Sequence, residues 1–432
     1  MAEFLPGYGP VPVGTVLLIA GSILMIFLRR LLTKKSNHGI FPPGPRRWPF
    51  VGNLLQMDLA APYNTLQEFA GQYGPVYSVQ LGGTTAVVLV GYDVIHEALV
   101  GHADEFAARP ILALAKDTDV IGGLVFHTGD HQRILRRFSL TTLKNHGMGK
   151  FTMDERISEE VSCLIKRLTD MEGSPFEPTF VLSSAVSNVI CATVLGKRFE
   201  YEDATFLDLL GRINFNVRET GSPAAQLYNA FPIFRLLRQP YEVFSDNIKN
   251  VRKYIDKAID EHRSSLVTTD PQDYIDSFLI QQAKEASNPD SPFTDFQLNT
   301  CIANLFAAGS ETTATTLRWA LLLMMKFMDV QECVQREIDD TLGRDRPPTL
   351  SDRHRLPYTV AVINEIQRFG NIVPMNLPHA TSTDVHFRGY FLPKDDVPAS
   401  VRALHVRSSF SSSQRFCSDS HSNQLLDLHF LI

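Results

Sequence analysis

The chain has 432 residues, of which 44% are hydrophobic and 20% are charged; these proportions are typical of a globular protein and exclude one that is disordered throughout. A formal net charge of -6 argues against nucleic acid as a partner, because domains that bind this polyanion are usually basic. The five cysteines are scattered, with no Cys-x-x-Cys spacing, which fits a reducing compartment and excludes the usual zinc motifs.

The N-terminal segment predicts a membrane anchor. Residues 11–28 are strongly apolar, close to the roughly 20 residues that cross a bilayer as a helix. Basic residues follow between Arg29 and Lys35. A cleaved secretory signal is the alternative, but such a signal carries its positive charges before the apolar run and ends at a small-residue cleavage site. The positive-inside rule then places residues 1–10 in the lumen and everything after Leu31 in the cytosol.

Residues 29–45 join this anchor to the body as a basic and proline-rich hinge. Three prolines between Pro42 and Pro45 favour a stiff, extended backbone that holds the body off the membrane. Two β-prone runs follow, Pro75–Leu81 and Ala86–Val90, with two glycines between them. This pattern predicts a β-hairpin at the start of the body.

The rest of the body is predicted to be mostly helical. From about Glu155 to Gln282, apolar residues recur at three- and four-residue steps, as on one face of a helix. Thr294 to Gln297 predict a capping box, and the apolar run that follows, to about Phe327, predicts a helix of roughly 34 residues and about 50 Å. A second helix carries apolar residues on one face, at Tyr358, Val362, Ile366 and Phe369. The fold class is therefore mainly α with a small β region.

A polar motif, Ala308-Gly309-Ser310-Glu311-Thr312-Thr313, interrupts the middle of the long helix. Glycine destabilises a helix interior by about 1 kcal/mol relative to alanine, and threonine hydroxyls compete for carbonyls one turn back. We therefore expect a locally distorted helix that admits water, in which Glu311 beside Thr312 outlines a proton relay. A notch for helix packing is the alternative, and the motif alone leaves it open.

Glu365 and Arg368 lie three residues apart on the second helix, on one face and able to pair. Taken alone, they predict a surface ion pair that stabilises the fold by about 1 kcal/mol at most.

In this order, the motifs resemble the signature of the cytochrome P450 family. The central Ala-Gly-x-Glu-Thr-Thr helix is followed by Glu-x-x-Arg, then by Pro-His and Phe-Arg-Gly-Tyr. Further strings are similar to the microsomal family-two branch, which oxidises drugs and fatty acids: Pro357–Ile363, Glu365–Phe369, Arg136–Leu140, Gly147–Lys150 and Gln226–Asn229. The resemblance runs from about Pro42 to Lys394 and implies the cytochrome P450 fold, incomplete at the C-terminus.

The resemblance also implies roles for individual residues. Glu311 and Thr312 would guide protons during oxygen activation, whereas Glu365 and Arg368 would be structural, buried where they brace the haem loop. Cofactor binding would fall to Arg109, Gln132, Arg136, His379 and Arg415. The arginines suit haem propionates because a guanidinium can grip a carboxylate with two hydrogen bonds. Gln132 stands where the family usually has tryptophan; it can still donate a hydrogen bond, but the ring packing is lost.

A substrate pocket is expected beside the relay. Phe306 and Ala307 should face the same side of the long helix as Thr312, and the resemblance places Val373 opposite them. Such an apolar pocket with few polar groups predicts a lipophilic ligand.

The end of the chain departs from the family pattern. Relatives carry Phe-x-x-Gly-x-Arg-x-Cys-x-Gly, whose cysteine thiolate is the axial ligand of the haem iron. This chain keeps Phe410, Arg415 and Cys417 at the right offsets but lacks both glycines. Residues 395–432 contain nine serines and no glycine, so a chance match in a divergent, serine-rich tail is the alternative. A shifted reading frame or an alternative splice would explain the break.

The resemblance implies a haem-dependent monooxygenase of the endoplasmic reticulum membrane, with its catalytic domain, residues 46–394, on the cytosolic side. It would oxidise lipophilic molecules such as xenobiotics, fatty acids or steroids, with O2 and with electrons from NADPH through a flavoprotein reductase. The alternative is a membrane-anchored, catalytically impaired member without a proper haem-ligand loop. Iron ligation by Cys417 distinguishes the two.

Overall fold

A computed structural model of the chain describes Gly21 and residues 40–149, 151–231, 239–344, 346–394 and 402–406. The chain divides into two compact units, one made of Met1–Phe41 and His386–Phe391 and the other of Pro42–Val385 and Leu392–Ile432; we call the second unit the body. Apart from Gly21, the anchor predicted at residues 11–28 lies outside the described residues. Within the described part of the chain, no helix is both long and apolar enough to cross a membrane.

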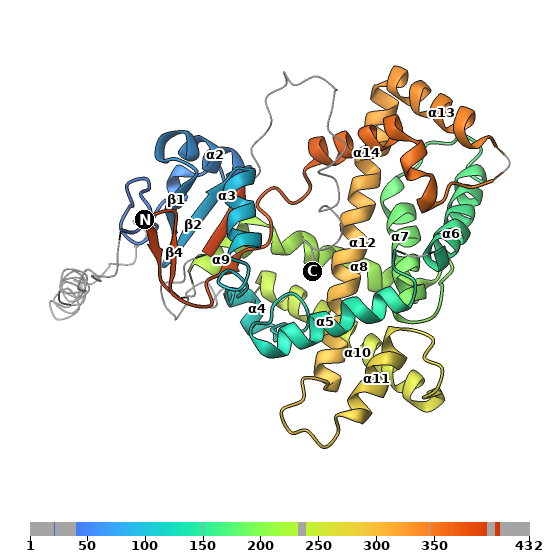
Figure 1. Ribbon diagram of the computed structural model, residues 1–432, viewed down its shortest axis with the longest axis horizontal. Coiled ribbons are helices and arrows are strands. Elements are labelled where there is room, and N and C mark those ends of the chain that lie inside the picture. The colour runs from blue at the N-terminus through green and yellow to red at the C-terminus, as the bar shows by residue number, and fades with distance from the viewer. Residues whose placement is uncertain are drawn as a thin grey trace, which may run out of the picture. The chain divides into compact units, whose positions relative to one another are not determined.

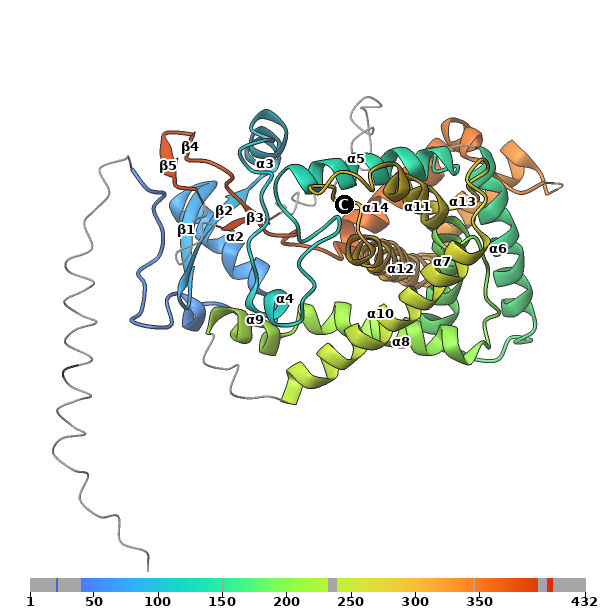
Figure 2. The ribbon, with the colours of Figure 1, turned by 90° about the horizontal axis from the view of Figure 1, so that it is seen from below.

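The body is mainly helical with a small β region, as predicted (Figure 1). Its helices are α2 (Pro62–Tyr73), α3 (Tyr92–His96), α4 (Ala113–Asp117), α5 (Asp130–Asn145), α6 (Phe151–Thr169), α7 (Pro178–Val194), α8 (Ala204–Thr220), α9 (Pro223–Ala230), α10 (Gln239–Ser265), α11 (Tyr274–Lys284), α12 (Asp295–Lys326), α13 (Met328–Leu342) and α14 (Pro357–Gly370). Figure 2 shows α12 almost end-on, with α7 and α10 beside it. The long helix predicted from the sequence is α12, and the predicted helix with the Glu-x-x-Arg motif is α14.

A four-stranded sheet opens the body. β1 (Val76–Leu81) and β2 (Thr84–Val90) form the predicted antiparallel hairpin, with Val76 opposite Leu89. Gly82 in the turn has a φ of 59°, a conformation that favours glycine. β6 (Arg402–Val406) pairs in parallel with β2 and antiparallel with β3 (His379–Ala380), which gives the order β1-β2-β6-β3. Five residues of the predicted divergent tail therefore belong to the sheet. β4 (Val385–Phe387) and β5 (Tyr390–Leu392) form a separate pair.

The proline-rich segment before the sheet lies against β1. Ser78 donates its backbone N–H to the carbonyl of Pro43 at 2.7 Å and its hydroxyl to the carbonyl of Pro42 at 2.9 Å. A Cβ on Gly44 would collide with the Ser78 carbonyl. These contacts attach Pro42–Pro45 to the body, whereas the sequence predicted only an extended spacer.

At the start of α12, one of the two hydrogen bonds of the predicted capping box is present. The Thr294 hydroxyl accepts a hydrogen bond from the Gln297 backbone N–H at 3.2 Å, which satisfies a helix N–H that has no partner within the helix. The Gln297 side chain does not return the bond as a capping box requires. Its amide oxygen accepts from the Gly123 N–H at 2.7 Å, so the residue ties a distant loop to the start of α12.

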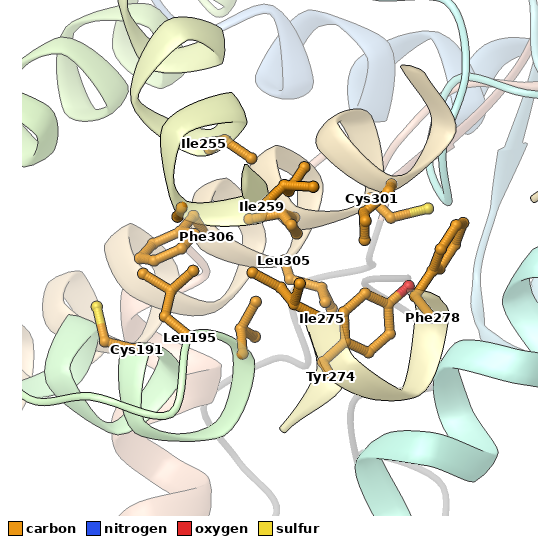
Figure 3. Close-up of a cluster of buried hydrophobic side chains, with 14 of the residues drawn as sticks. Cys191, Leu195, Ile255, Ile259, Tyr274, Ile275, Phe278, Cys301, Leu305 and Phe306 are labelled. Carbon is orange, nitrogen blue, oxygen red and sulfur yellow. The ribbon is translucent and has the colours of Figure 1, made fainter. Parts of the chain in front are cut away.

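The main hydrophobic core surrounds α12. In Figure 3, Phe306 of α12 lies near Ile259 of α10 and Leu195, which follows α7. Tyr274 brings a hydroxyl into this core, and the Ser139 hydroxyl lies 2.7 Å from it, so both buried groups are hydrogen-bonded. The core therefore fixes α12, which carries the candidate relay, against its neighbours.

An ion pair between the half-buried His262 and the buried Asp273 joins α10 to the start of α11. His262 Nε2 lies 2.7 Å from Asp273 Oδ2, and His262 Nδ1 lies 2.7 Å from the Ala258 carbonyl oxygen. The hydrogen bond with Asp273 raises the pKa of His262 to about 9, from an ordinary 6.5. Because the folded-state pKa is the higher one, this stabilisation is fully present below the ordinary pKa and is lost as the pH rises through about 9.

We expect the free energy of unfolding to fall by about 1–2 kcal/mol between roughly pH 6.5 and 9.5, after allowance for solvent screening of a half-buried imidazole. His262→Gln should remove most of this fall. Chemical denaturation across that pH range measures it, with the exposed His354 replaced by glutamine as the control. An equal fall in the parent chain and in His262→Gln would contradict the assignment.

Candidate active site

Threonine hydroxyls bond to the carbonyls of α12 in the middle of the helix. Thr312 Oγ1 donates to the Ala308 carbonyl at 2.6 Å, and Thr316 Oγ1 donates to the Thr312 carbonyl at 2.9 Å. This competition one turn back is the one that the sequence predicted. The helix nevertheless runs uninterrupted from Asp295 to Lys326, so the predicted local distortion does not break it.

Gly309 gives α12 room to pack against α7. A Cβ at this position would lie 2.7 Å from Ile190 Cδ1 and 3.1 Å from Ile190 Cγ1. The neighbouring Ser310 is buried, and its hydroxyl has no hydrogen-bond partner among the described residues. The packing notch left open by the sequence is thus present at Gly309, beside the candidate relay.

Glu311 is held on one of its two oxygens. Its Oε1 accepts from Arg318 Nη2 at 2.6 Å and from Thr315 Oγ1 at 3.0 Å, whereas Oε2 is buried without a partner in the described part of the chain. Glu311 and Thr312 follow each other on the helix, so their side chains point about 100° apart. The hydrogen bonds place them in two neighbouring columns, one running from Glu311 to Arg318 and the other from Ala308 to Thr316.

Two neighbouring arginines, Arg109 and Arg136, form a half-buried cationic site. Arg109 donates Nη1 to the Pro378 carbonyl at 3.1 Å and its backbone N–H to Thr128 Oγ1 at 3.0 Å. Burial and the nearby charge of Arg136 lower the pKa of Arg109 to about 10, and burial also lowers the pKa of Arg136. Two like charges that are partly withdrawn from water repel each other, and a nearby anion offsets this cost. This donor set fits a group with carboxylates, such as the haem propionates.

His379 reaches the same part of the body through β3. The backbone N–H of Ala380 donates to the Ala108 carbonyl at 2.8 Å, and His379 Nδ1 lies 2.7 Å from the Phe106 carbonyl oxygen. These bonds fix the segment that carries Arg109 against the strand that carries His379. The structure therefore brings together three of the residues predicted to bind the cofactor: Arg109, Arg136 and His379.

The sequence did not reveal an anchored loop beside this site. Asn304 of α12 accepts two backbone N–H groups with one oxygen, from Leu124 at 2.9 Å and from Val125 at 3.2 Å. Gln132, predicted as a cofactor ligand, donates Nε2 to the Leu124 carbonyl at 3.3 Å. The two side chains connect α5, the loop and α12. A lone asparagine on an apolar helix face was the only hint of this anchor in the sequence.

We expect Asn304→Ala to lower the free energy of unfolding by about 1–3 kcal/mol, because it leaves two N–H groups at the edge of the core without an acceptor. Asn304→Asp keeps an acceptor oxygen of the same shape and should cost less. Urea denaturation of the two variants measures the difference. Equal losses in both would show that the acceptor oxygen is not what holds the loop.

With this geometry established, comparison with known proteins identifies the family. The family model described as Cytochrome P450 matches residues 42–416. The chain belongs to the cytochrome P450 family. It is 41% identical over 405 residues to cytochrome P450 2C23 of Rattus norvegicus, covering 93% of this chain and 82% of that relative. It is 43% identical over 373 residues to cytochrome P450 2C44 of Mus musculus, covering 86% and 76%. The predicted resemblance to microsomal family-two enzymes is confirmed.

Members of this cytochrome P450 family are haem-dependent monooxygenases that receive electrons from NADPH through a reductase. The sequence motifs placed the end of the resemblance at about Lys394. The family model matches beyond this point and ends at residue 416. It therefore includes Arg415 and stops immediately before Cys417. Both residues lie outside the described part of the chain, so their predicted roles remain predictions.

The Glu-x-x-Arg pair of this cytochrome P450 is present but not buried. Arg368 donates Nε and Nη2 to the two oxygens of Glu365, each at 2.6 Å. The arginine lowers the pKa of Glu365. The two side chains are 49% and 47% exposed, so the predicted burial is wrong for the described residues. A fixed i,i+3 pair can form wherever α14 folds, with or without a loop above it.

The predicted substrate-pocket residues do not share one surface. Phe306 is fully buried in the core cluster (Figure 3), and its part in a substrate pocket stays a prediction. It lies six residues before Thr312, which turns the two side chains about 120° apart on a helix. Ala307 is half-buried against the same core, and Val373 is 37% exposed. A groove of about 890 Å³ among α6, α7, α8 and α10 includes none of these residues.

Proposed function

We propose that this chain is a haem-thiolate monooxygenase that inserts one oxygen atom into lipophilic small molecules. The observation that carries the proposal is the half-buried pair Arg109 and Arg136 beside His379. A guanidinium can grip a carboxylate with two hydrogen bonds, so two neighbouring arginines are a suitable donor set for the haem carboxylates that the family supplies. Bound haem would supply the oxygen chemistry, and the chain would supply orientation, protons and a dry pocket.

Cys417 is proposed as the axial ligand. Cys191 and Cys301 are buried in the apolar core, where burial raises the pKa of both thiols, that of Cys301 to about 12. They therefore stay protonated near neutral pH, and a protonated thiol is a poor ligand. Cys163 lies on α6 and Cys333 lies on α13. Neither helix carries a residue of the cationic site. Cys417 is the cysteine that follows the Glu-x-x-Arg helix, and Arg415 is proposed to hold a propionate beside it.

The proton relay is proposed to use Glu311 and Thr312. The Thr312 hydroxyl donates a hydrogen bond to the Ala308 carbonyl. The lone pairs of Thr312 Oγ1 can therefore accept a hydrogen bond from a proton donor. Glu311 keeps Oε2 without a partner among the described residues. Since the two side chains occupy neighbouring columns of α12, water between them would carry the proton from one column to the other.

Substrate, partner and membrane are proposed from the resemblance and the relatives. Ala307 and Val373 are proposed to line a pocket for xenobiotics, fatty acids or steroids, and a flavoprotein reductase to deliver electrons. Residues 11–28 are proposed to anchor the chain in the endoplasmic reticulum membrane, with the body on the cytosolic side, because the basic residues follow the apolar run.

The test is full-length protein reconstituted with a reductase and NADPH in lipid. We expect one haem per chain, a red-shifted band of the reduced carbon monoxide complex, and NADPH-dependent hydroxylation of a fatty acid such as lauric acid or of a drug-like probe. Haem at one per chain without that band would point to a ligand other than thiolate. A chain with neither haem nor turnover would support the impaired member that lacks a haem-ligand loop.

A further inference from the structure

Arg318 connects the candidate relay acid to a second helix. It lies seven residues after Glu311 on α12, two turns along, and so on the same face. Its Nη2 donates to Glu311 Oε1 at 2.6 Å and also to Thr315 Oγ1. Its Nη1 donates to Thr179 Oγ1 of α7 at 2.9 Å. One guanidinium thus joins three side chains from two helices.

Thr179, the partner of Arg318 on α7, is itself held in place by hydrogen bonds. Thr179 is the second residue of α7, and its backbone N–H donates to both carboxylate oxygens of Glu177, each at 3.1 Å. Glu177 is the N-cap residue of the helix. The two helices are also in contact where Ile190 fills the notch at Gly309. Arg318 is therefore held between two points of a packed helix pair.

The consequence falls on Glu311. The Arg318 and Glu311 side chains are 26% and 21% exposed, so the pair is partly shielded from water and its geometry is constrained. Two donors fix Oε1, and no partner occupies Oε2 within the described residues. A carboxylate held in this way presents its two oxygens unequally, because a proton added at Oε1 would compete with the guanidinium, whereas one added at Oε2 would not.

We propose that Arg318 is a positioning residue for Glu311, which restricts proton exchange to Oε2. At that oxygen the carboxylate takes a proton from a protonated water molecule, which becomes neutral water, and then passes the proton to a second water molecule, while Arg318 and Thr315 keep Oε1 in place. The use of this proton in monooxygenation rests on the proposed function. The hold of Arg318 on one oxygen does not, and the two can be tested separately.

Infrared spectroscopy tests the hold in the full-length chain, with or without haem. The difference between the parent chain and Glu311→Gln isolates the carboxylate stretching bands of Glu311. Repeating the subtraction in an Arg318→Met background should shift those bands, because Oε1 loses its charged donor. In an Arg318→Lys background the bands should lie close to their positions in the parent chain, because lysine again supplies a charged donor. Arg344→Met, which breaks the exposed pair with Asp339, is the matched control and should leave the bands unchanged.

If Arg318→Met does not fold, Thr179→Val replaces it, since this variant keeps the guanidinium and removes its outer hydrogen bond, together with the hydrogen bond from the Thr179 hydroxyl to Glu177. It should move the Glu311 bands in the same direction by a smaller amount. Bands that move in neither Thr179→Val nor an Arg318 variant overturn the proposal, whatever the haem content. This readout is independent of turnover, so its failure is distinguishable from failure of the proposed monooxygenase.

In reconstituted enzyme, product formed per NADPH consumed should fall roughly tenfold in Arg318→Met, less than the roughly 100- to 10,000-fold that a proton-transfer group itself contributes, because Arg318 acts through Glu311. Arg318→Lys should stay within about threefold of the parent. The solvent deuterium isotope effect on product formation should rise in Arg318→Met and not in Arg344→Met. Shifted infrared bands with unchanged product yield and isotope effect would also overturn the proposal, because Glu311 would then be repositioned without effect on proton delivery.

Discussion

Replacing Cys417 with serine is expected to abolish the red-shifted band of the reduced carbon monoxide complex and to lower monooxygenation at least about 100-fold, equivalent to roughly 2.7 kcal/mol of transition-state stabilisation. A serine hydroxyl lacks the electron donation of a thiolate. The raised thiol pKa of Cys191 and Cys301 leaves neither as a ready substitute. The measurement is the spectrum and the haem content of both proteins at equal concentration.

Two further cysteines provide the control for this substitution. Cys163 and Cys333 are half-buried on α6 and α13, so Cys163→Ser and Cys333→Ser should keep the band and the activity of the parent. If Cys417→Ser instead behaves like these two, Cys417 is not the ligand, and the match around Phe410 is a coincidence of the serine-rich tail.

Arg109→Met should have opposite effects with and without haem. With haem, the loss of a charge-assisted contact of about 1.5–3 kcal/mol should weaken haem binding roughly 10- to 100-fold. Without haem, the change removes a half-buried cation next to Arg136 and should raise the free energy of unfolding by on the order of 1 kcal/mol. The lost hydrogen bond to the Pro378 carbonyl reduces that gain.

The direction of the pKa shift of Arg109 determines how its effect on the stability of the haem-free fold changes with pH. The pKa of Arg109 is lowered to about 10 from 12.5, so its cost to the haem-free fold is fully present below about pH 10 and decreases only above it. Haem titration and urea denaturation at neutral pH measure both effects. Arg133→Met is the matched control: Arg133 lies on α5, the helix that carries Arg136, is 57% exposed and pairs with Asp104, so little change is expected. A loss of stability in haem-free Arg109→Met would contradict the account.

The exposure of Glu365 and Arg368 determines how much their ion pair contributes to the stability of α14. A buried pair that lost one partner would cost about 3–5 kcal/mol, and this penalty would apply here if Glu365 and Arg368 were enclosed by a loop. They are about half exposed and paired with each other. An exposed pair contributes about 1 kcal/mol at most, so an altered loop beyond Lys394 does not by itself destabilise α14.

The sequence by itself determined the elements whose cause is local. Alternation and a pair of glycines predicted the hairpin of β1 and β2, and apolar periodicity predicted the course of α12. The three-residue spacing of Glu365 and Arg368 predicted their ion pair. The seven-residue spacing from Glu311 to Arg318 carried the same kind of information. Neighbours along the chain are brought together by the helix or turn itself, so spacing is enough to place them.

Only the tertiary structure decided which partners distant residues meet. β6 enters the sheet between β2 and β3, Gln297 leaves its own helix cap for Gly123, and Phe306 turns into the core and away from Thr312. Arg109 and Arg136 became neighbours because β3 fixes the segment before α4 in place. Each of these outcomes depends on how helices and strands pack, and that is settled by the shape and burial of surfaces far apart in the chain, which local periodicity does not encode.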